Sequence, residues 1–416
     1  MPEQPTTTDL VVFGATSFVG QLLCRYLVER HGCTGDGPEG LTWAIAGRSR
    51  AKLDALVSEL GGDAGELEVL VADATDPDDV ARLATSARVV VSTVGPYARY
   101  GSELVAACAA AGTDYVDLTG ETHWVRRMVD AHQATAEETG ARLVPCAGFD
   151  SIPSDLGVHV LQAAARERHG SPATRVRMAV KAMRGGASGG TIASMLNLLD
   201  EVRSDPDLRR QLGDPYALCP PESRGGPRQP DVNRPVHDEV FGRWLAPFVM
   251  AAINTRVVHR TNALLDHAYG EGFRYDEAMM TGRGPAGALA ATGVTAGLGA
   301  FVVAAVTPGV RSLVAKALPE PGEGPSPEAQ ERGFFDVRFW GTTDAGERVT
   351  AKVTGDRDPG YGSTARMLGE AAACLALDVP ARDEPAAGGF WTPASLLGDQ
   401  LVRRLVDHAG LTFAAS

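Results

Sequence analysis

The chain has 416 residues, enough for two or three domains with their own hydrophobic cores. Its formal net charge of -13 argues against a nucleic-acid partner, because phosphate binding needs Lys and Arg clustered on one face. The six cysteines form no C-x-x-C pair, the nine histidines show no metal-ligand spacing, and residues 1–9 resemble no signal peptide. We therefore expect a cytoplasmic protein without a metal site.

The first predicted element is a strand over residues 9–13, followed by a glycine-bounded turn and a helix over 21–28. A glycine at the start of such a turn lets a pyrophosphate approach the backbone, and the helix N-terminus beyond it attracts negative charge. The spacing is G-x-x-S-x-x-G, which departs from G-x-G-x-x-G and also occurs in ordinary tight turns. The predicted dinucleotide-binding residues are Gly14, Ala15, Thr16, Ser17, Phe18, Val19 and Gly20.

A second buried strand is predicted over residues 41–46, and it is followed by Arg48 and Ser49. An NAD site has an acidic residue here for the ribose 2′-OH, whereas a 2′-phosphate favours arginine and small hydroxyl groups. Arg48 and Ser49 therefore predict NADP(H). The alternative is that they only begin a solvated basic helix.

Two further strands lead to the same predicted site. The strand over 67–73 ends at Asp73, which either flanks the adenine or is only a turn residue. The strand beginning at residue 88 breaks at Val94, Gly95 and Pro96, and in a doubly wound sheet the ligand lies outside such carboxyl ends. These three residues are predicted to meet the nicotinamide half of the cofactor.

Alternating strands and helices continue to about residue 150, with strands over 115–118 and 141–146. Repeated βα units of this kind give a parallel sheet with right-handed crossovers. The predicted fold class is α/β, with a Rossmann-type doubly wound parallel sheet in residues 1–150 and a second α+β domain in 151–375.

Five motifs together resemble the saccharopine dehydrogenase-like oxidoreductases, and within them the actinobacterial trans-acting enoyl reductases. The motifs lie at residues 14–20, 46–48, 93–101, 115–121 and 148–155. The resemblance extends from about residue 9 to 413. It implies a C-terminal segment, residues 376–416, that packs back on the cofactor domain.

The second half has a different pattern. A strand is expected over 175–183, a helix over 191–199 and a long surface loop over 206–235. Residues 334–342 and 348–354 predict a hairpin. We assign this half to substrate binding or dimerisation.

Residues 284–310 contain no charged residue and are long enough to cross a bilayer. Their content of Ala, Gly, Thr and Val gives weak insertion, so we expect a buried or interfacial hairpin rather than a transmembrane helix. The segment could also pack in a homodimer, contact a membrane peripherally or accept a lipid-like acyl chain.

The resemblance implies an NADPH-dependent enoyl reductase of lipid metabolism, acting on a hydrophobic acyl or polyketide substrate bound to a carrier or lipid. Tyr97, Tyr115 and Asp150 lie near the carboxyl ends of predicted strands and are the candidate catalytic residues, although packing or turn roles are the simpler explanation for each. One alternative is saccharopine reductase-like reduction of an imine or carbonyl in an amino-acid-like metabolite, with Arg175, Arg177, Lys181 and Arg184 binding carboxylates. Another is an NADP-binding or lipid-associated regulatory protein without turnover.

Overall fold

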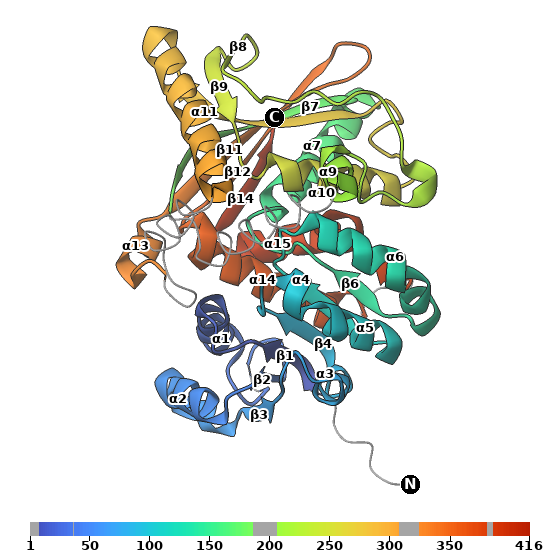
Figure 1. The fold of residues 1–416 in the computed structure, drawn as a ribbon, viewed down its shortest axis with the longest axis vertical. Helices are drawn as coiled ribbons and strands as arrows, with labels where there is room; N and C mark the ends of the chain where they lie inside the picture. Colours follow the sequence, from blue (N-terminus) through green and yellow to red (C-terminus); the bar gives the residue numbers. More distant parts are fainter. Residues whose placement is uncertain (1–7, 36, 186–205, 308–323, 381–385) are drawn as a thin grey trace. The chain divides into compact units, whose positions relative to one another are not determined.

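The computed structural model describes residues 8–35, 37–185, 206–307, 324–380 and 386–416, and the chain forms two compact units. Unit 1 comprises Met1–Gly148 and Thr364–Leu405, and unit 2 comprises Phe149–Ser363 and Val406–Ser416. The expected helix over 191–199 lies outside the described residues. Figure 1 gives the element labels used below.

Unit 1 contains a seven-stranded parallel sheet in the order β13-β6-β5-β4-β1-β2-β3. Its strands are β1 (Thr8–Phe13), β2 (Trp43–Gly47), β3 (Glu68–Val71), β4 (Ala87–Ser92), β5 (Asp114–Asp117), β6 (Arg142–Val144) and β13 (Gly389–Phe390). Its helices are α1 (Phe18–His31), α2 (Arg50–Leu60), α3 (Pro77–Ala84), α4 (Tyr97–Tyr100), α5 (Ser102–Ala111), α6 (Thr122–Thr139) and α14 (Thr364–Ala373), and α15 (Gly398–His408) ends in unit 2.

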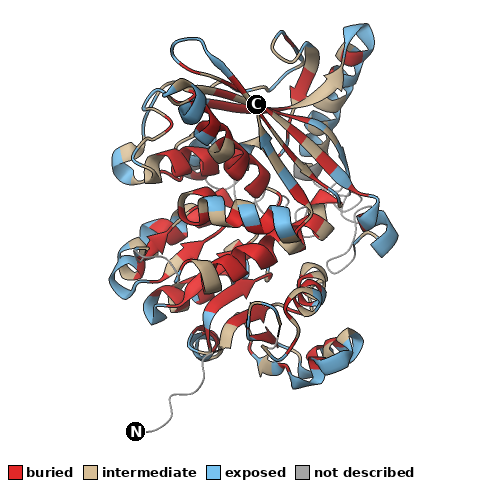
Figure 2. Ribbon diagram, turned by 180° about the vertical axis from the view of Figure 1, so that it is seen from behind, coloured by how far each residue is buried: buried red, intermediate tan, exposed pale blue. Residues whose placement is uncertain are grey.

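The strand order of unit 1 confirms the doubly wound fold. The chain runs from β1 through β2 to β3, and then returns to β4 on the other side of β1. Right-handed crossovers consequently place α1 and α2 on one face and α5 and α6 on the other. The interior strands are nearly continuous apolar runs, as a sheet covered on both faces requires, and they are largely buried in Figure 2.

Unit 2 is built on a seven-stranded mixed sheet in the order β14-β12-β11-β7-β10-β9-β8. Its strands are β7 (Arg175–Arg184), β8 (Val236–Asp238), β9 (Arg243–Pro247), β10 (Arg274–Gly282), β11 (Phe334–Thr342), β12 (Arg348–Gly355) and β14 (Leu411–Ala415). Its helices are α7 (Ile152–His169), α9 (Pro206–Gly213), α10 (Ala251–Leu264), α11 (Gly284–Val306) and α13 (Pro327–Glu331). Short 3-10 or π-helical turns in the two units are η1 (Gly62–Glu66), η2 (Pro221–Ser223), η3 (Pro359–Ser363), η4 (Cys374–Asp378) and η5 (Pro393–Leu397).

Several expectations for the second half can be compared with unit 2. The hairpin is confirmed, since β11 pairs antiparallel with β12 in an unbroken register. The expected loop over 206–235 instead begins with the helix α9. The expected hairpin in the uncharged segment is wrong, because residues Gly284–Val306 form one helix, α11, of 23 residues. Its alanines favour a helix, and no proline interrupts it after Pro285.

The two compact units divide at Gly148, close to the boundary predicted at 150, and they differ from the prediction in the C-terminal part of the chain. The C-terminal return to unit 1 begins at Thr364, because α14 packs against α1 and against β4 and β5. The last residues, from Val406, belong to unit 2, since β14 pairs with β12. The predicted C-terminal segment, residues 376–416, is therefore divided between the two units, with its last residues in unit 2.

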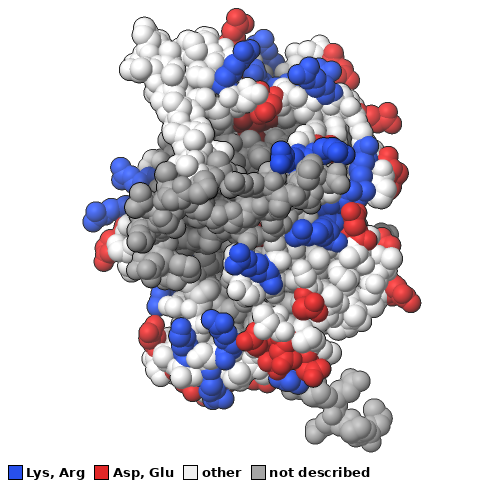
Figure 3. Space-filling model, in the orientation of Figure 1, with Lys and Arg blue, Asp and Glu red and all other residues white. Residues whose placement is uncertain are grey.

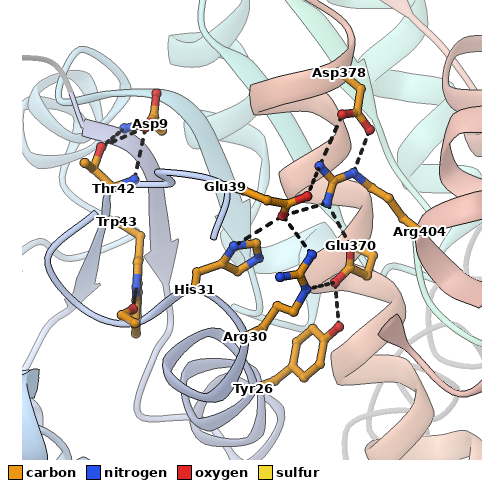
Figure 4. Close-up of polar contacts among 11 residues, drawn as sticks. Asp9, Tyr26, Arg30, His31, Glu39, Thr42, Trp43, Glu370, Asp378 and Arg404 are labelled. Carbon is orange, nitrogen blue, oxygen red and sulfur yellow. Dashed lines mark hydrogen bonds and ion pairs between the residues drawn. The ribbon is translucent and has the colours of Figure 1, made fainter. Parts of the chain in front are cut away.

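A buried ionic network joins the two sequence segments of unit 1 (Figure 4). The guanidinium of Arg404 on α15 contacts three carboxylates: Nε lies 2.6 Å from Asp378, and its amino groups lie 3.1 Å from Glu370 and 3.2 Å from Glu39. Glu370 is fully buried on α14 and also accepts a hydrogen bond of 2.5 Å from the Tyr26 hydroxyl. Five residues distant in sequence therefore fix the C-terminal segment to the first βα unit.

Candidate functional site

The turn between β1 and α1 requires glycine at both ends. Gly14 has a φ of 85°, and a Cβ there would lie 2.7 Å from the Thr93 hydroxyl oxygen. A Cβ on Gly20 would lie 2.2 Å from the carbonyl oxygen of Gly14. The glycines therefore allow α1 to begin directly against the end of β1.

Ser17 has a structural role that explains its place in the motif. Its hydroxyl caps α1 by accepting a hydrogen bond of 2.9 Å from the Gly20 amide. The same oxygen lies 2.9 Å from the hydroxyl of Thr93, which donates to the carbonyl of Gly14 at 2.9 Å. This hydroxyl pair ties the β1–α1 turn to the end of β4.

The turn lies where the strand order reverses, because β1 is flanked by β2 on one side and β4 on the other. In open α/β sheets a ligand binds outside the carboxyl ends of the strands at this point. The predicted residues from Gly14 to Gly20 all fall in this turn or in the first turn of α1. The backbone close to the turn and the helix N-terminus suit a pyrophosphate.

Arg48 follows β2 at the same edge of the sheet and is exposed. Ser49 is the N-cap of α2 and accepts a hydrogen bond from the Lys52 amide. Asp73 follows β3, and its pKa is lowered first by hydrogen bonds from Thr75 and further by the charge of Arg48. An exposed guanidinium and a capped helix start are thus placed together after β2.

Val94, Gly95 and Pro96 form the connection between β4 and α4 at this edge. The carboxylate of Glu121 organises the next residues: one oxygen accepts from the Tyr97 amide and the other from the Ala98 amide, both at 2.9 Å. Glu121 is buried, and sequence reasoning did not select it as a site residue. Its position after a strand, in the motif Thr-Gly-Glu, was the available signal.

Tyr97 and Tyr115 are both buried within unit 1, and both hydroxyls have partners. Tyr97 donates to the carbonyl of Ser92 and Tyr115 donates to Asp117, each at 2.9 Å. Burial raises the pKa of both phenols well above the usual value and raises the pKa of Asp117 to about 7. These contacts match a packing role, and a proton-donor role for either tyrosine stays a prediction.

Asp150 differs from the two tyrosines. It lies between β6 and α7, is half-buried, and receives no hydrogen bond or ion pair from any residue that the structure describes. Burial raises the pKa of its carboxyl to about 6. A carboxyl of this kind is a suitable general acid near neutral pH.

Unit 2 has its own buried polar cluster beside a cavity. The amide of Asn254 on α10 donates to Ser154 on α7 at 3.1 Å and to Glu277 on β10 at 2.9 Å, and the Tyr275 hydroxyl donates to Glu277 at 2.7 Å. Burial raises the pKa of Glu277 to about 7. Tyr275 and Glu277 also line a cavity of about 620 Å³. This volume lies within the range of about 300–1,000 Å³ that is typical of small-ligand sites.

The cations proposed to bind substrate carboxylates are already paired within unit 2. Arg175 contacts Asp276, Arg177 contacts Asp238 at 2.5 Å, and Lys181 contacts Asp336 at 3.0 Å. Asp276 and Asp238 are buried, so two of these pairs neutralise carboxylates inside the unit. Arg184 instead lies over the ring of Phe334.

Comparison with known proteins matches one family model to the N-terminal part of the chain and matches individual relatives to nearly all of it. Residues 10–144 match the family described as the saccharopine dehydrogenase NADP binding domain. A Mycobacterium tuberculosis protein whose name assigns it provisionally to the trans-acting enoyl reductases is 44% identical, with 97% of each chain covered. The trans-acting enoyl reductase of Mycobacterium ulcerans is 39% identical, with 98% of this chain and 97% of the relative covered.

A solved structure shares the fold. Apo saccharopine dehydrogenase (L-Glu forming) from Saccharomyces cerevisiae has a TM-score of 0.52 and 12% sequence identity, covering 98% of this chain and 99% of its own. The motif-based resemblance is confirmed by these matches, and unit 1 contains a nicotinamide-nucleotide binding domain.

Proposed function

Because this chain belongs to the trans-acting enoyl reductase family, with a saccharopine dehydrogenase-type NADP-binding domain, we propose that it reduces the C=C bond of an α,β-unsaturated acyl substrate with NADPH. The acyl chain is hydrophobic and is carried as a thioester on a carrier protein or lipid, as the word trans-acting in the names of its relatives suggests. The observation that carries the proposal is the full-length similarity to proteins with this name.

The residues of unit 1 fit the cofactor. A Cβ at Gly14 or Gly20 would clash within the turn that receives the pyrophosphate, and Ser17 with Thr93 ties that turn to the end of β4. Arg48 binds the 2′-phosphate, because its guanidinium is exposed after β2, the strand that precedes the ribose contact in this fold. When bound, NADPH supplies the hydride that adds to the β-carbon.

The residues of the chain must orient the nicotinamide and donate the proton that the α-carbon of the substrate takes up. Val94, Gly95 and Pro96 orient the nicotinamide half, and Glu121 fixes the chain directly after them. Asp150 donates the proton: its carboxyl is half-buried, unpaired among the described residues and protonated below about pH 6. Tyr97 and Tyr115 are weaker candidates because their hydroxyls already donate inside unit 1.

Substrate polarity favours the acyl substrate over an amino-acid-like one. A dicarboxylate metabolite would need free cations, yet three of the four candidates on β7 are engaged by Asp276, Asp238 and Asp336. Breaking such a pair to bind substrate would remove a cation that compensates a carboxylate of unit 2. We further propose that the protein acts in the cytoplasm.

The test is oxidation of NADPH in the presence of enoyl thioesters of increasing chain length, with saccharopine-type imines as the comparison. We expect turnover of enoyl thioesters alone. Tight NADPH binding without turnover of any substrate would favour a regulatory protein instead.

The cofactor assignment has its own test. Arg48→Glu should lower the affinity for NADPH by about 100-fold, since it replaces a charge-assisted contact with repulsion worth about 3 kcal/mol. Affinity for NADH should change little. Arg82→Glu, at an exposed arginine on α3, is the matched control, and an unchanged NADPH preference in Arg48→Glu would refute the assignment.

A further inference from the structure

The helix α11 exposes apolar side chains along most of its length. Leu289 is 75% exposed, Val303 62% and Val302 46%. Within residues 284–304, only Gly287 and Ala291 are buried. This helix is therefore no ordinary core helix, although it is long and apolar enough to cross a membrane by length and composition.

One face of α11 is held by the sheet of unit 2. The helix packs against β9 and β10, and its half-buried residues, including Val294, Leu298 and Phe301, lie between the exposed ones. The Thr281 hydroxyl also lies 2.9 Å from the carbonyl oxygen of Gly287 and donates to it. The opposite, outer face of α11 is not covered by any described element of unit 2, because its side chains are exposed.

The outer face lacks the charges that a surface helix normally presents to water. From Gly284 to Val306 there is no Lys, Arg, Asp or Glu on either face. Figure 3 shows the result, a continuous surface without charged residues at the upper left, where Figure 1 places α11. An apolar surface of this extent marks an interaction site.

The distribution of the exposed residues distinguishes a fluid partner from a folded one. At 3.6 residues per turn, the exposed residues cover more than half of the helix circumference, which is wider than one stripe of residues spaced three and four apart. From residue 289 onward they are Leu289, Ala290, Thr292, Gly293, Ala296, Gly297, Gly299, Ala300, Val302 and Val303. A second protein helix would cover one stripe and leave the rest in water. Lipid acyl chains can cover the whole outer surface.

The beginning of α11 has the residues expected at a membrane interface. Trp244 on β9 pairs in register with Gly282, directly before the exposed Arg283 that precedes the helix. Tryptophan and arginine are favoured at the boundary between acyl chains and headgroups. The 23 residues of α11 would extend along about 34 Å of this boundary.

We propose that α11 docks unit 2 on a lipid bilayer, with its outer face among the acyl chains and Arg283 and Trp244 at the headgroups. The inner face stays on β9 and β10, so the protein attaches to one leaflet and does not cross the membrane. Because the net charge is -13, attraction to anionic lipids cannot drive the attachment, and apolar burial must. The proposal goes beyond the reaction and does not depend on it.

The test is flotation of the full chain with phosphatidylcholine vesicles, without cofactor or substrate. We expect binding that persists at about 0.5 M salt, where exposed charges are screened. Val303→Glu should lower the partition coefficient by about tenfold, and Leu289→Glu/Val303→Glu by more, because each introduces a charge at the apolar face. Val406→Glu is the matched control, since Val406 is an exposed helical valine outside α11, and it should bind as the native protein does.

For each variant, the oligomeric state is measured by light scattering and the unfolding temperature by thermal unfolding. All three variants replace exposed side chains, so their unfolding temperatures should match the native value, and Leu289→Ser/Val303→Ser provides a milder pair if they do not. Absence of vesicle binding by the native chain would overturn the proposal. A dimer that Val303→Glu dissociates, without vesicle binding, would assign the face to a second copy and overturn it as well.

Equal loss of binding in Val303→Glu and Val406→Glu would also overturn the role of α11. Failure of the proposed reaction is distinguished from these outcomes, because vesicle binding is measured without turnover. A protein that floats with vesicles and reduces no enoyl thioester would keep this proposal and lose the other.

Discussion

Replacement of Gly20 by alanine tests how the β1–α1 turn receives its cofactor. The added Cβ would lie 2.2 Å from the carbonyl oxygen of Gly14 and 2.9 Å from the Cα of Ala15. Both neighbours are backbone, so the first turn of α1 must move by roughly 1 Å to restore van der Waals contact. Overpacking of this kind costs about 1–3 kcal/mol.

The shift also displaces the helix N-terminus from the pyrophosphate. We expect the Kd for NADPH to rise by about 10- to 100-fold, equivalent to about 1.4–2.8 kcal/mol, measured by fluorescence titration. The unfolding temperature should fall in parallel, measured by calorimetry. Gly65→Ala is the control, because a Cβ there has nothing within 4 Å, and it should change neither quantity. If Gly20→Ala binds NADPH as tightly as the native protein, the cofactor does not use this turn.

Two further predictions follow from buried and half-buried charges. Arg404→Ala should lower the free energy of unfolding by about 3–5 kcal/mol in urea titrations. It removes the nearer of the two cations beside the buried carboxylate of Glu370, and the remaining one, Arg30, lies 4.0 Å away. Arg25→Ala breaks an exposed pair and should cost less than about 1 kcal/mol, so equal effects would contradict the argument. If Asp150 is the proton donor, its raised pKa means that it is protonated below about pH 6, and kcat/KM should fall about tenfold per pH unit above that value. Asp150→Asn should abolish this pH dependence with much lower activity, and an unchanged profile would exclude the role.

The strands and turns of the proposed cofactor site were largely predictable because these elements are local. A buried strand, a glycine turn and an amphipathic helix can be recognised within about 20 residues. Arg48 and the break at Gly95 could be assigned for the same reason, since each directly follows a strand. Parallel strands then bring their carboxyl ends to one edge of the sheet.

Contacts between distant segments were not predictable. Ser17 weakened the motif when read alone, and only the fold brings Thr93 within 2.9 Å of its hydroxyl. Glu121 was not selected, because its amide partners at Tyr97 and Ala98 lie 24 and 23 residues earlier. In the same way no local pattern pairs Arg404 with Glu39, or separates α14 from β14 into different units.

By itself, the sequence determined the alternation of strands and helices in unit 1, the position of the β1–α1 turn and the absence of charge in residues 284–306, because these depend on neighbouring side chains. Only the tertiary structure decided which apolar residues are covered. The same Ala- and Val-rich pattern is compatible with a core helix and with an exposed one, and the difference lies in what packs against it. For α11, among the residues that the structure describes, the sheet covers one face, and Leu289 and Val303 lie at the surface.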